Sequence, residues 1–101
     1  MDNISQEAFH ENLNTNFHAV DSGGTGVDLE LVSCKDLGST PKQEQFSLLF
    51  RGPKQPLLEQ MTYELKHDVL GENLIFLVPV RQDADFLYYE AIFNRFSEEN
   101  K

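Results

Sequence analysis

Four short apolar runs in the second half of the chain dominate its hydrophobic pattern. They cover residues 46–50, 61–65, 74–80 and 86–93. Each run is rich in aromatic and branched side chains and is bounded by Gly, Pro, Asn or Asp, which is typical of β-strands. The segments between the runs are too short for crossover helices, so we expect antiparallel pairing through short connections.

Two further strands are predicted upstream, at residues 15–20 and 27–31. Apolar and polar residues alternate in both, as in a strand with one face in the core and the other in water. The glycine-rich segment 21–26 between them predicts a hairpin turn. The polar segments 35–45 and 53–60 predict exposed loops.

A short helix is expected over residues 4–13, with Asn3 or Ser5 as its N-cap. Such a helix is too short to be stable alone and must dock on the sheet. The run at 74–80 is apolar at consecutive positions. We therefore expect it to be central in the sheet, or covered on its second side by the helix.

The sequence thus predicts a single, mostly all-β domain over residues 1–101, with residues 97–101 as a frayed tail. About six strands of this size either close into a small antiparallel β-barrel or form a two-layer sandwich. We favour a barrel plugged or flanked by the N-terminal helix, because two of the strands are apolar on both faces.

The charge of the chain restricts its partners. The formal net charge is −9, from 17 acidic and 8 basic residues. This excess of acid argues against nucleic acid and against anionic membrane surfaces, which both require clustered Lys and Arg. A solvated acidic surface that maintains solubility is the favoured interpretation. An acidic docking surface for a basic partner is the alternative.

Location is indicated by the cysteine content and the N-terminus. The single Cys34 cannot form an internal disulfide and is typical of a reducing compartment. No basic segment followed by an apolar run is present at the N-terminus, and no apolar run is long enough to span a bilayer as a helix. We expect a soluble cytoplasmic protein, although a protein exported without a classical signal would show the same features.

Two charged residues are the strongest candidates for a functional site. Arg51 lies where a strand ends, and Glu90 lies within an otherwise apolar strand, where a carboxylate needs a partner. In the favoured interpretation they form a structural ion pair between two strands, with the bidentate geometry that Arg prefers. In the other, they join His67 and Asn94 in a polar site for a ligand or for a partner's carboxylate.

The last strand has more aromatic residues than one core face can hold. Some of them must face outward, lie under the helix, or contact a partner. Phe86 and Tyr88 are the residues that we expect at such an interface. The aromatic residues concerned are Phe86, Tyr88, Tyr89, Phe93 and Phe96.

Motifs for metal, cofactor or covalent chemistry do not stand out. His10, His18 and His67 are scattered, and Cys34 has no cysteine or histidine ligand at zinc spacing. The chain has no nucleophile elbow, and the glycines at 23–26 lack the helix and Lys of a phosphate loop. We therefore expect no metal and no cofactor.

Several phrases of the sequence together resemble an uncharacterised family of small bacterial domains. The resemblance covers roughly residues 9–94, and the family has no assigned activity. Some of its members occur beside genes for phage-tail-like fibre and collar proteins. The phrases are FSLLFRGP at 46–53, TYELKH at 62–67, LG at 70–71, IFLVPV at 75–80 and YEAIFN at 89–94.

The favoured functional hypothesis is therefore a non-enzymatic protein-binding or assembly module that acts through a protein partner or through self-association. The resemblance implies an accessory role in a phage-tail-like or fibre-like bacterial assembly. The alternative is a small ligand-binding barrel or enzyme with a polar site around Arg51, His67 and Glu90.

Overall fold

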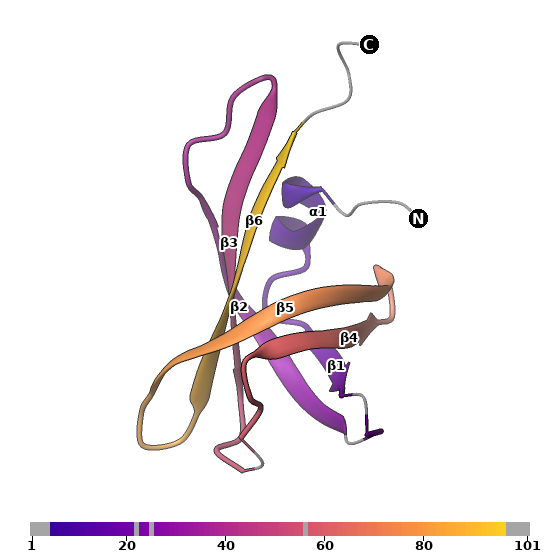
Figure 1. Cartoon of the computed structure of the whole chain (residues 1–101), viewed down its shortest axis with the longest axis vertical. Coiled ribbons are helices and arrows are strands. Elements are labelled where there is room, and N and C mark those ends of the chain that lie inside the picture. Colours follow the sequence, from indigo (N-terminus) through magenta and orange to yellow (C-terminus); the bar gives the residue numbers. More distant parts are fainter. Residues whose placement is uncertain (1–4, 22, 25, 56, 97–101) are drawn as a thin grey trace.

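The computed structural model describes residues 5–21, 23–24, 26–55 and 57–96. Within them the chain forms a short N-terminal helix followed by strands, and this confirms the prediction of a mostly β domain (Figure 1). Within the described residues, no helix is long and apolar enough to cross a membrane. The elements are α1 (Gln6–Glu11), β1 (Asn16–Val20), β2 (Gly26–Asp36), β3 (Gln43–Gly52), β4 (Met61–His67), β5 (Gly71–Gln82) and β6 (Leu87–Phe96).

The strands form one antiparallel sheet that closes on itself. β1, β2 and β3 pair in succession, as do β4, β5 and β6. Two pairings between distant segments, β3 with β6 and β1 with β4, join these halves. The resulting order β1-β2-β3-β6-β5-β4 is that of a closed barrel. Of the two architectures left open by the sequence, the barrel is therefore the one found.

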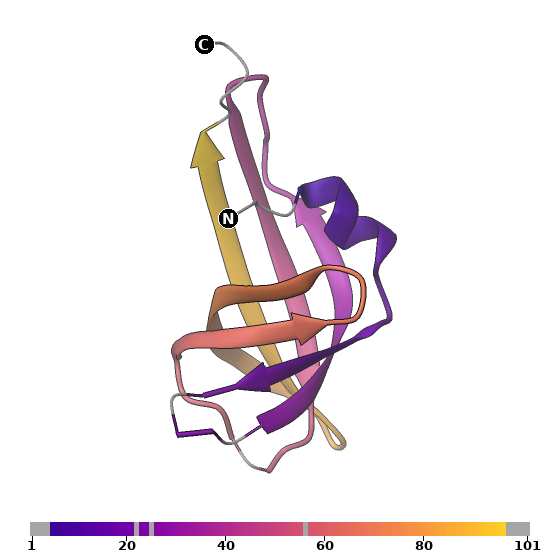
Figure 2. The same ribbon diagram turned by 90° about the vertical axis from the view of Figure 1, so that its right-hand side faces the viewer.

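One seam of the barrel is only partly paired. β5 pairs with β6 from Val78 to Gln82, whereas residues 71–77 of β5 pair with β4 alone. On the side of Val78 that leads toward residue 71, β3 and β6 continue as a pair and diverge from β4 and β5 (Figure 2). The helix α1 lies against β2 at this diverging end. The helix thus closes the end of the barrel at which the sheet opens.

Aromatic rings fill the core. Phe46 of β3 and Phe93 of β6 stack with their centroids 4.8 Å apart. Phe9 of α1 packs on both rings, at 6.0 and 5.7 Å. Deeper in the barrel, Phe17 and Phe50 meet edge to face at 5.3 Å. The expectation that the helix docks on the sheet is confirmed, and Phe9 is the side chain that docks it.

The helix is shorter than predicted. Ser5 is its N-cap and accepts a hydrogen bond from the Ala8 amide, which decides between the two expected caps, while Asn3 lies outside the described residues. The helix ends at Glu11 with Asn12 as its C-cap. Asn14 then adopts a left-handed conformation with φ of 66°, which Asn tolerates better than most residues. The Asn14 amide then donates to the Leu31 carbonyl and begins the sheet.

The predicted loop at 35–45 is shorter than expected, because both of its ends belong to strands. β2 continues to Asp36 and β3 begins at Gln43, so only a short connection remains. The reason is a β-bulge between Leu31 and Ser33, which breaks the alternation by inserting one residue. After the bulge, Cys34 lies opposite the buried Leu48, and the strand continues in a new phase.

Candidate functional site

Arg51 is held by an acidic residue on the neighbouring strand. Its Nη2 and Nε atoms each lie 3.0 Å from Oε1 of Glu30, and its guanidinium carbon lies 4.4 Å from the centroid of the Phe86 ring. Hydrogen bonds to Glu30 and to Tyr88 raise the pKa of Arg51. The expected Arg51–Glu90 ion pair is wrong, because Glu30 stands directly opposite Arg51 in the β2–β3 register, whereas Glu90 stands opposite Leu49.

Tyr88 is also engaged within the chain. Its side chain is only 9% exposed, its hydroxyl donates to Oδ2 of Asp83 at 2.8 Å, and the Arg81 guanidinium lies 4.5 Å from its ring centroid. Backbone hydrogen bonds from Asp85 and Phe86, together with the Tyr88 hydroxyl, lower the pKa of Asp83. The expectation of an exposed Tyr88 is therefore wrong. Phe86 is partly buried beneath Arg51.

The His67 side chain stabilises the turn between β4 and β5 through hydrogen bonds. Its Nδ1 accepts hydrogen bonds from the Val69 and Leu70 amides at 3.0 and 3.1 Å. Since Nδ1 is an acceptor, Nε2 carries the proton and donates to Oγ1 of Thr15 at 2.8 Å. The ring also lies 4.4 Å from that of Phe17. Every polar atom of this side chain thus has a structural partner.

Replacing His67 by Ala is expected to lower the free energy of unfolding by about 1–2 kcal/mol, because the turn amides lose their acceptor and Phe17 loses its covering ring. Urea unfolding would measure this change. The control is His10→Ala, at an exposed position of α1, which we expect to change stability by less than about 0.5 kcal/mol. Equal effects of the two substitutions would contradict the role of His67 in stabilising the turn.

The four polar residues proposed as one site are not brought together. Arg51 bonds Glu30, His67 bonds Thr15 and its own turn, and Asn94 accepts from the Gln43 side chain. No hydrogen bond or ion pair joins any two of Arg51, His67, Glu90 and Asn94. The geometry therefore gives no support to a joint polar site for a ligand.

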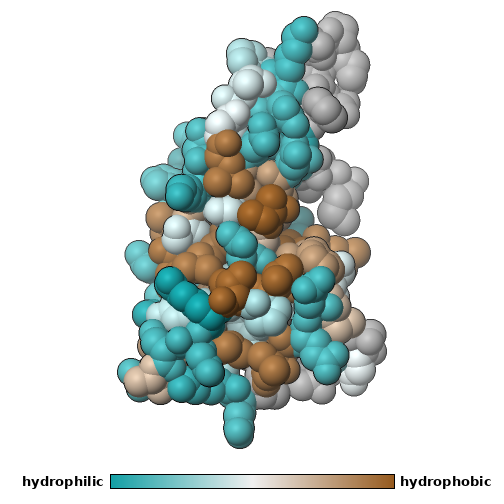
Figure 3. Space-filling model, turned by 60° about the vertical axis from the view of Figure 1, so that its left-hand side comes forward, coloured by the Kyte–Doolittle hydropathy of each residue, from teal (hydrophilic) through white to brown (hydrophobic). Residues whose placement is uncertain are grey.

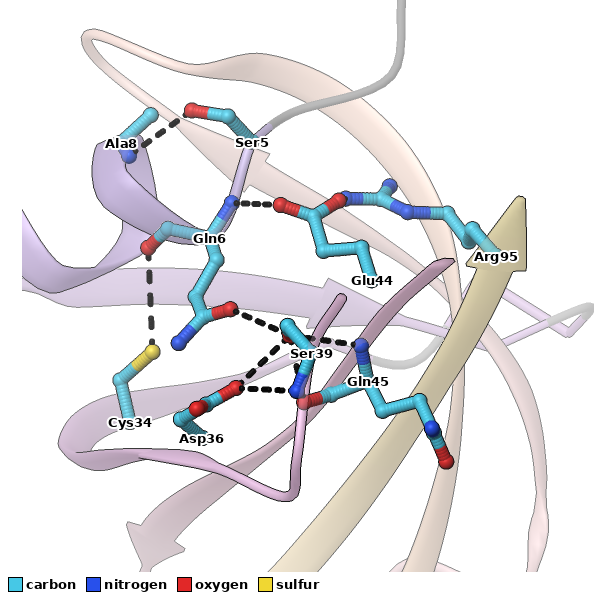
Figure 4. A network of polar contacts seen from close by, with 9 residues as sticks. All are labelled: Ser5, Gln6, Ala8, Cys34, Asp36, Ser39, Glu44, Gln45 and Arg95. Atoms are coloured by element: carbon cyan, nitrogen blue, oxygen red, sulfur yellow. Dashed lines mark hydrogen bonds and ion pairs between the residues drawn. The ribbon is translucent and has the colours of Figure 1, made fainter. Parts of the chain in front are cut away.

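A shallow depression of about 350 Å³ lies beside the helix and is lined by Gln6, Glu7, His10 and Glu44. Figure 4 shows its surroundings. The Glu44 carboxylate accepts from the Gln6 amide at 3.1 Å and from Arg95 at 2.7 Å. These polar groups attach the start of α1 to β3 and β6, and Glu44 is already occupied by that role.

The same network extends to the end of β2. The Ser39 hydroxyl contacts Oδ1 of Asp36 at 2.7 Å and the Gln6 side chain at 3.4 Å, and its hydrogen bonds lower the pKa of Asp36. The Cys34 thiol donates to the Gln6 carbonyl at 3.8 Å (Figure 4). Burial, and then the Asp36 and Glu44 carboxylates, raise the pKa of Cys34, which disfavours the reactive thiolate.

The outer side of β5 and β6 carries apolar side chains that nothing in the described structure covers. Leu74 is 72% exposed, Phe76 49% and Ile92 58%. Of the two expectations for the run at 74–80, the central position is the one found, since β5 lies between β4 and β6 in the sheet. Cover by the helix is not found, because α1 packs on Phe46 and Phe93 instead. Figure 3 shows hydrophobic residues, interrupted by hydrophilic ones, across the middle of one face of the molecule.

Glu90 lies among these apolar residues. In the sheet register it stands between Leu49 of β3 and Val78 of β5, and all three side chains are partly buried on the outer side. Among the described residues, no hydrogen bond or ion pair reaches the Glu90 carboxylate. We use the term outer apolar face for Leu49, Leu74, Phe76, Val78, Glu90 and Ile92.

Sequence reasoning selected Glu90 but missed the apolar residues around it and the true partner of Arg51. Alternation within β5 places Leu74, Phe76 and Val78 on one side, so the grouping was readable from the sequence. The exposure of that side could not be predicted from the sequence, since it depends on where the helix docks. Glu30 was hidden by the bulge that sets the β2–β3 register.

Comparison with known proteins adds a family and no activity. Residues 4–93 match the model of a family described as a domain of unknown function. The comparisons with curated proteins and with solved structures returned no match. The resemblance to an uncharacterised domain family is confirmed, and the function must be argued from the structure.

Proposed function

Because the chain belongs to the family of domains of unknown function DUF6916, we propose from its own structure that it is a protein-binding or assembly module that performs no chemistry. The observation that carries the proposal is the outer apolar face. An accessory role in a tail-like or fibre-like bacterial assembly, suggested by the sequence resemblance, is the setting that we propose for it.

The outer apolar face has the composition of an interface. Its exposed side chains flank the point where Val78 of β5 pairs with Glu90 of β6: Phe76 and Leu74 follow along β5, and Ile92 follows along β6. A partner that spans this point can bury them together. Residues at its edges are polar, including Glu64 opposite Leu74 and Thr62 opposite Phe76 on β4. An apolar centre with a polar rim is the usual anatomy of a protein–protein contact.

The barrel interior, by contrast, is an apolar core that stabilises the fold. Among the described residues no charged side chain is buried in it, and every buried side-chain nitrogen or oxygen has a hydrogen-bond partner. Such an interior offers no unpaired group for binding or catalysis. The alternative function, a ligand-binding barrel or enzyme around Arg51, His67 and Glu90, therefore receives no comparable support.

Site-specific photo-crosslinking tests the proposal. A photoreactive residue at position 92, on the outer apolar face, should give an adduct of discrete mass when the full chain is made in its native cells. The same probe at Asp28, an exposed position on the outer side of β2, should give none. Failure to form an adduct at both 92 and 76, or equal labelling from position 28, would refute the binding-module proposal.

A further inference from the structure

We infer that the outer apolar face binds a protein segment that presents one basic side chain, best an arginine, between apolar residues, and that Glu90 is the ion-pair partner of this side chain. The inference rests on the proposed function and specifies the chemistry of the partner. It follows from the position of Glu90, from the engagement of the nearby cations, and from the cost of covering a carboxylate.

Glu90 lies at the point where β5 and β6 meet, so a partner that spans both strands must cover it. It lies between Leu49 and Val78 across the sheet, and Ile92 is the next outward residue along its own strand. A surface that covers the exposed Phe76 and Ile92 must therefore also cover Glu90. A partner that uses Phe76 and Ile92 together thus removes the carboxylate from water.

The cations nearest in the sheet register already have partners. Arg51 stands opposite Tyr88, one outward position from Glu90, but its guanidinium bonds Glu30 and lies over Phe86. Arg81 also pairs with Tyr88 in the register, and its guanidinium lies over that ring. A counter-charge for the Glu90 carboxylate must therefore come from a binding partner.

Covering the carboxylate without a counter-charge is costly. An ionised group loses several kcal/mol when it is removed from water and left unpaired, which would offset much of the gain from apolar burial. A basic side chain on the partner removes this penalty. Arginine suits the position best, because its planar guanidinium can bond a carboxylate through two parallel hydrogen bonds and is less strongly hydrated than an ammonium group.

Long-range electrostatics favours the same partner. At a net charge of −9, the chain attracts basic proteins and repels a second copy of itself. The rim adds to this local field through Glu64, which stands opposite the apolar Leu74. We therefore assign the face to a different, basic protein segment and not to self-association.

Selection from a random peptide library displayed on phage provides the probe. Peptides selected on the full wild-type chain should carry Arg or Lys between apolar residues. Peptides selected on Glu90→Arg should carry Asp or Glu at that place, and Ile92→Asp should select nothing. Circular dichroism and thermal unfolding establish that each variant is folded before selection.

Affinities of one selected peptide then quantify the pair. Glu90→Gln should weaken binding by about tenfold or more, in the range measured for close interfacial charge pairs. Glu64→Gln, which removes a neighbouring carboxylate of the rim, should change it by less than about threefold. Exchanging Arg for Glu in the peptide should abolish binding to wild type and restore it on Glu90→Arg.

The outcomes separate the two proposals. Peptides without charge preference, or equal effects of Glu90→Gln and Glu64→Gln, would overturn the role of Glu90 and leave the binding module standing. A wild-type chain that self-associates through this face, with dimerisation lost in Ile92→Asp, would replace the basic partner by a second copy. Selection of no peptide, together with no crosslink at either position 92 or position 76, would overturn both.

Discussion

Replacing Phe9 by Ala is expected to lower the free energy of unfolding by about 3–5 kcal/mol, the range for removing a buried aromatic ring. Phe9 is 1% exposed and lies on both Phe46 and Phe93 at the end where β5 and β6 separate. Its loss leaves a cavity over two aromatic rings. Such a change is a large part of the stability of a typical domain, about 5–15 kcal/mol.

The substitution also removes what holds the helix. α1 has 6 residues, far fewer than an isolated helix needs in water. We expect the amides of α1 in Phe9→Ala to exchange with solvent much faster than those of β1 and β4. Glu7→Ala, at an exposed position of the same helix, is the control for helix propensity. A loss below about 1 kcal/mol on urea unfolding would show that polar contacts, not Phe9, dock the helix.

The strands could be predicted because their side chains repeat with the period of the pleat. In β3 every second residue from Phe46 to Gly52 is buried, and the same alternation is visible in β1 and in the first half of β2. Local composition sufficed there, since each strand contributes one face to a common core. Strand ends were less predictable, because pairing extended β2 and β3 into polar sequence.

Barrel closure and the partner of Arg51 could not be predicted from local pattern. Both depend on pairings between distant segments, such as β1 with β4, whose register no single segment encodes. A one-residue bulge shifts the β2–β3 register, and that register decides whether Arg51 meets Glu30. The sequence predicted an ion pair between Arg51 and a carboxylate on another strand, but named Glu90 where the structure has Glu30.

The outer apolar face shows a different limit. Consecutive apolar residues at 74–80 are typical of a strand buried on both sides, and the sequence left open a central position in the sheet or cover by the helix. The structure instead places the helix over Phe46 and Phe93 and leaves Leu74 and Phe76 exposed. The pattern that predicts double burial is equally compatible with cover supplied by another molecule, which is the basis of the proposed function.

Replacing Tyr89 by Phe is expected to lower the free energy of unfolding by about 2 kcal/mol at neutral pH, the usual cost of a buried donor left without an acceptor. The Tyr89 side chain is fully buried, and its hydroxyl accepts a hydrogen bond from the Leu58 amide at 3.0 Å. Leu58 is itself buried, in a segment predicted from the sequence to be an exposed loop. Water cannot easily replace the lost oxygen there.

The same residue should destabilise the wild-type protein at alkaline pH. Burial raises the pKa of Tyr89 above its ordinary value of 10.0. Between that value and the raised pKa of the folded state, the unfolded chain has released the Tyr89 proton and the folded chain has kept it. Since the unfolded state then binds fewer protons, the free energy of unfolding falls as pH rises, by about 1.4 kcal/mol per pH unit for one proton.

Tyr89→Phe has no such proton to lose at this position. Its stability should therefore decline less steeply above about pH 10, although Tyr63, whose pKa burial also raises, contributes in both proteins. The difference in free energy of unfolding between wild type and the variant should be constant from pH 7 to 9. It should become smaller above about pH 10, as Tyr89 of the unfolded wild-type chain ionises. Urea unfolding of both proteins across this range measures the difference, and a constant gap up to pH 11 would contradict the burial of an un-ionised Tyr89 in the core.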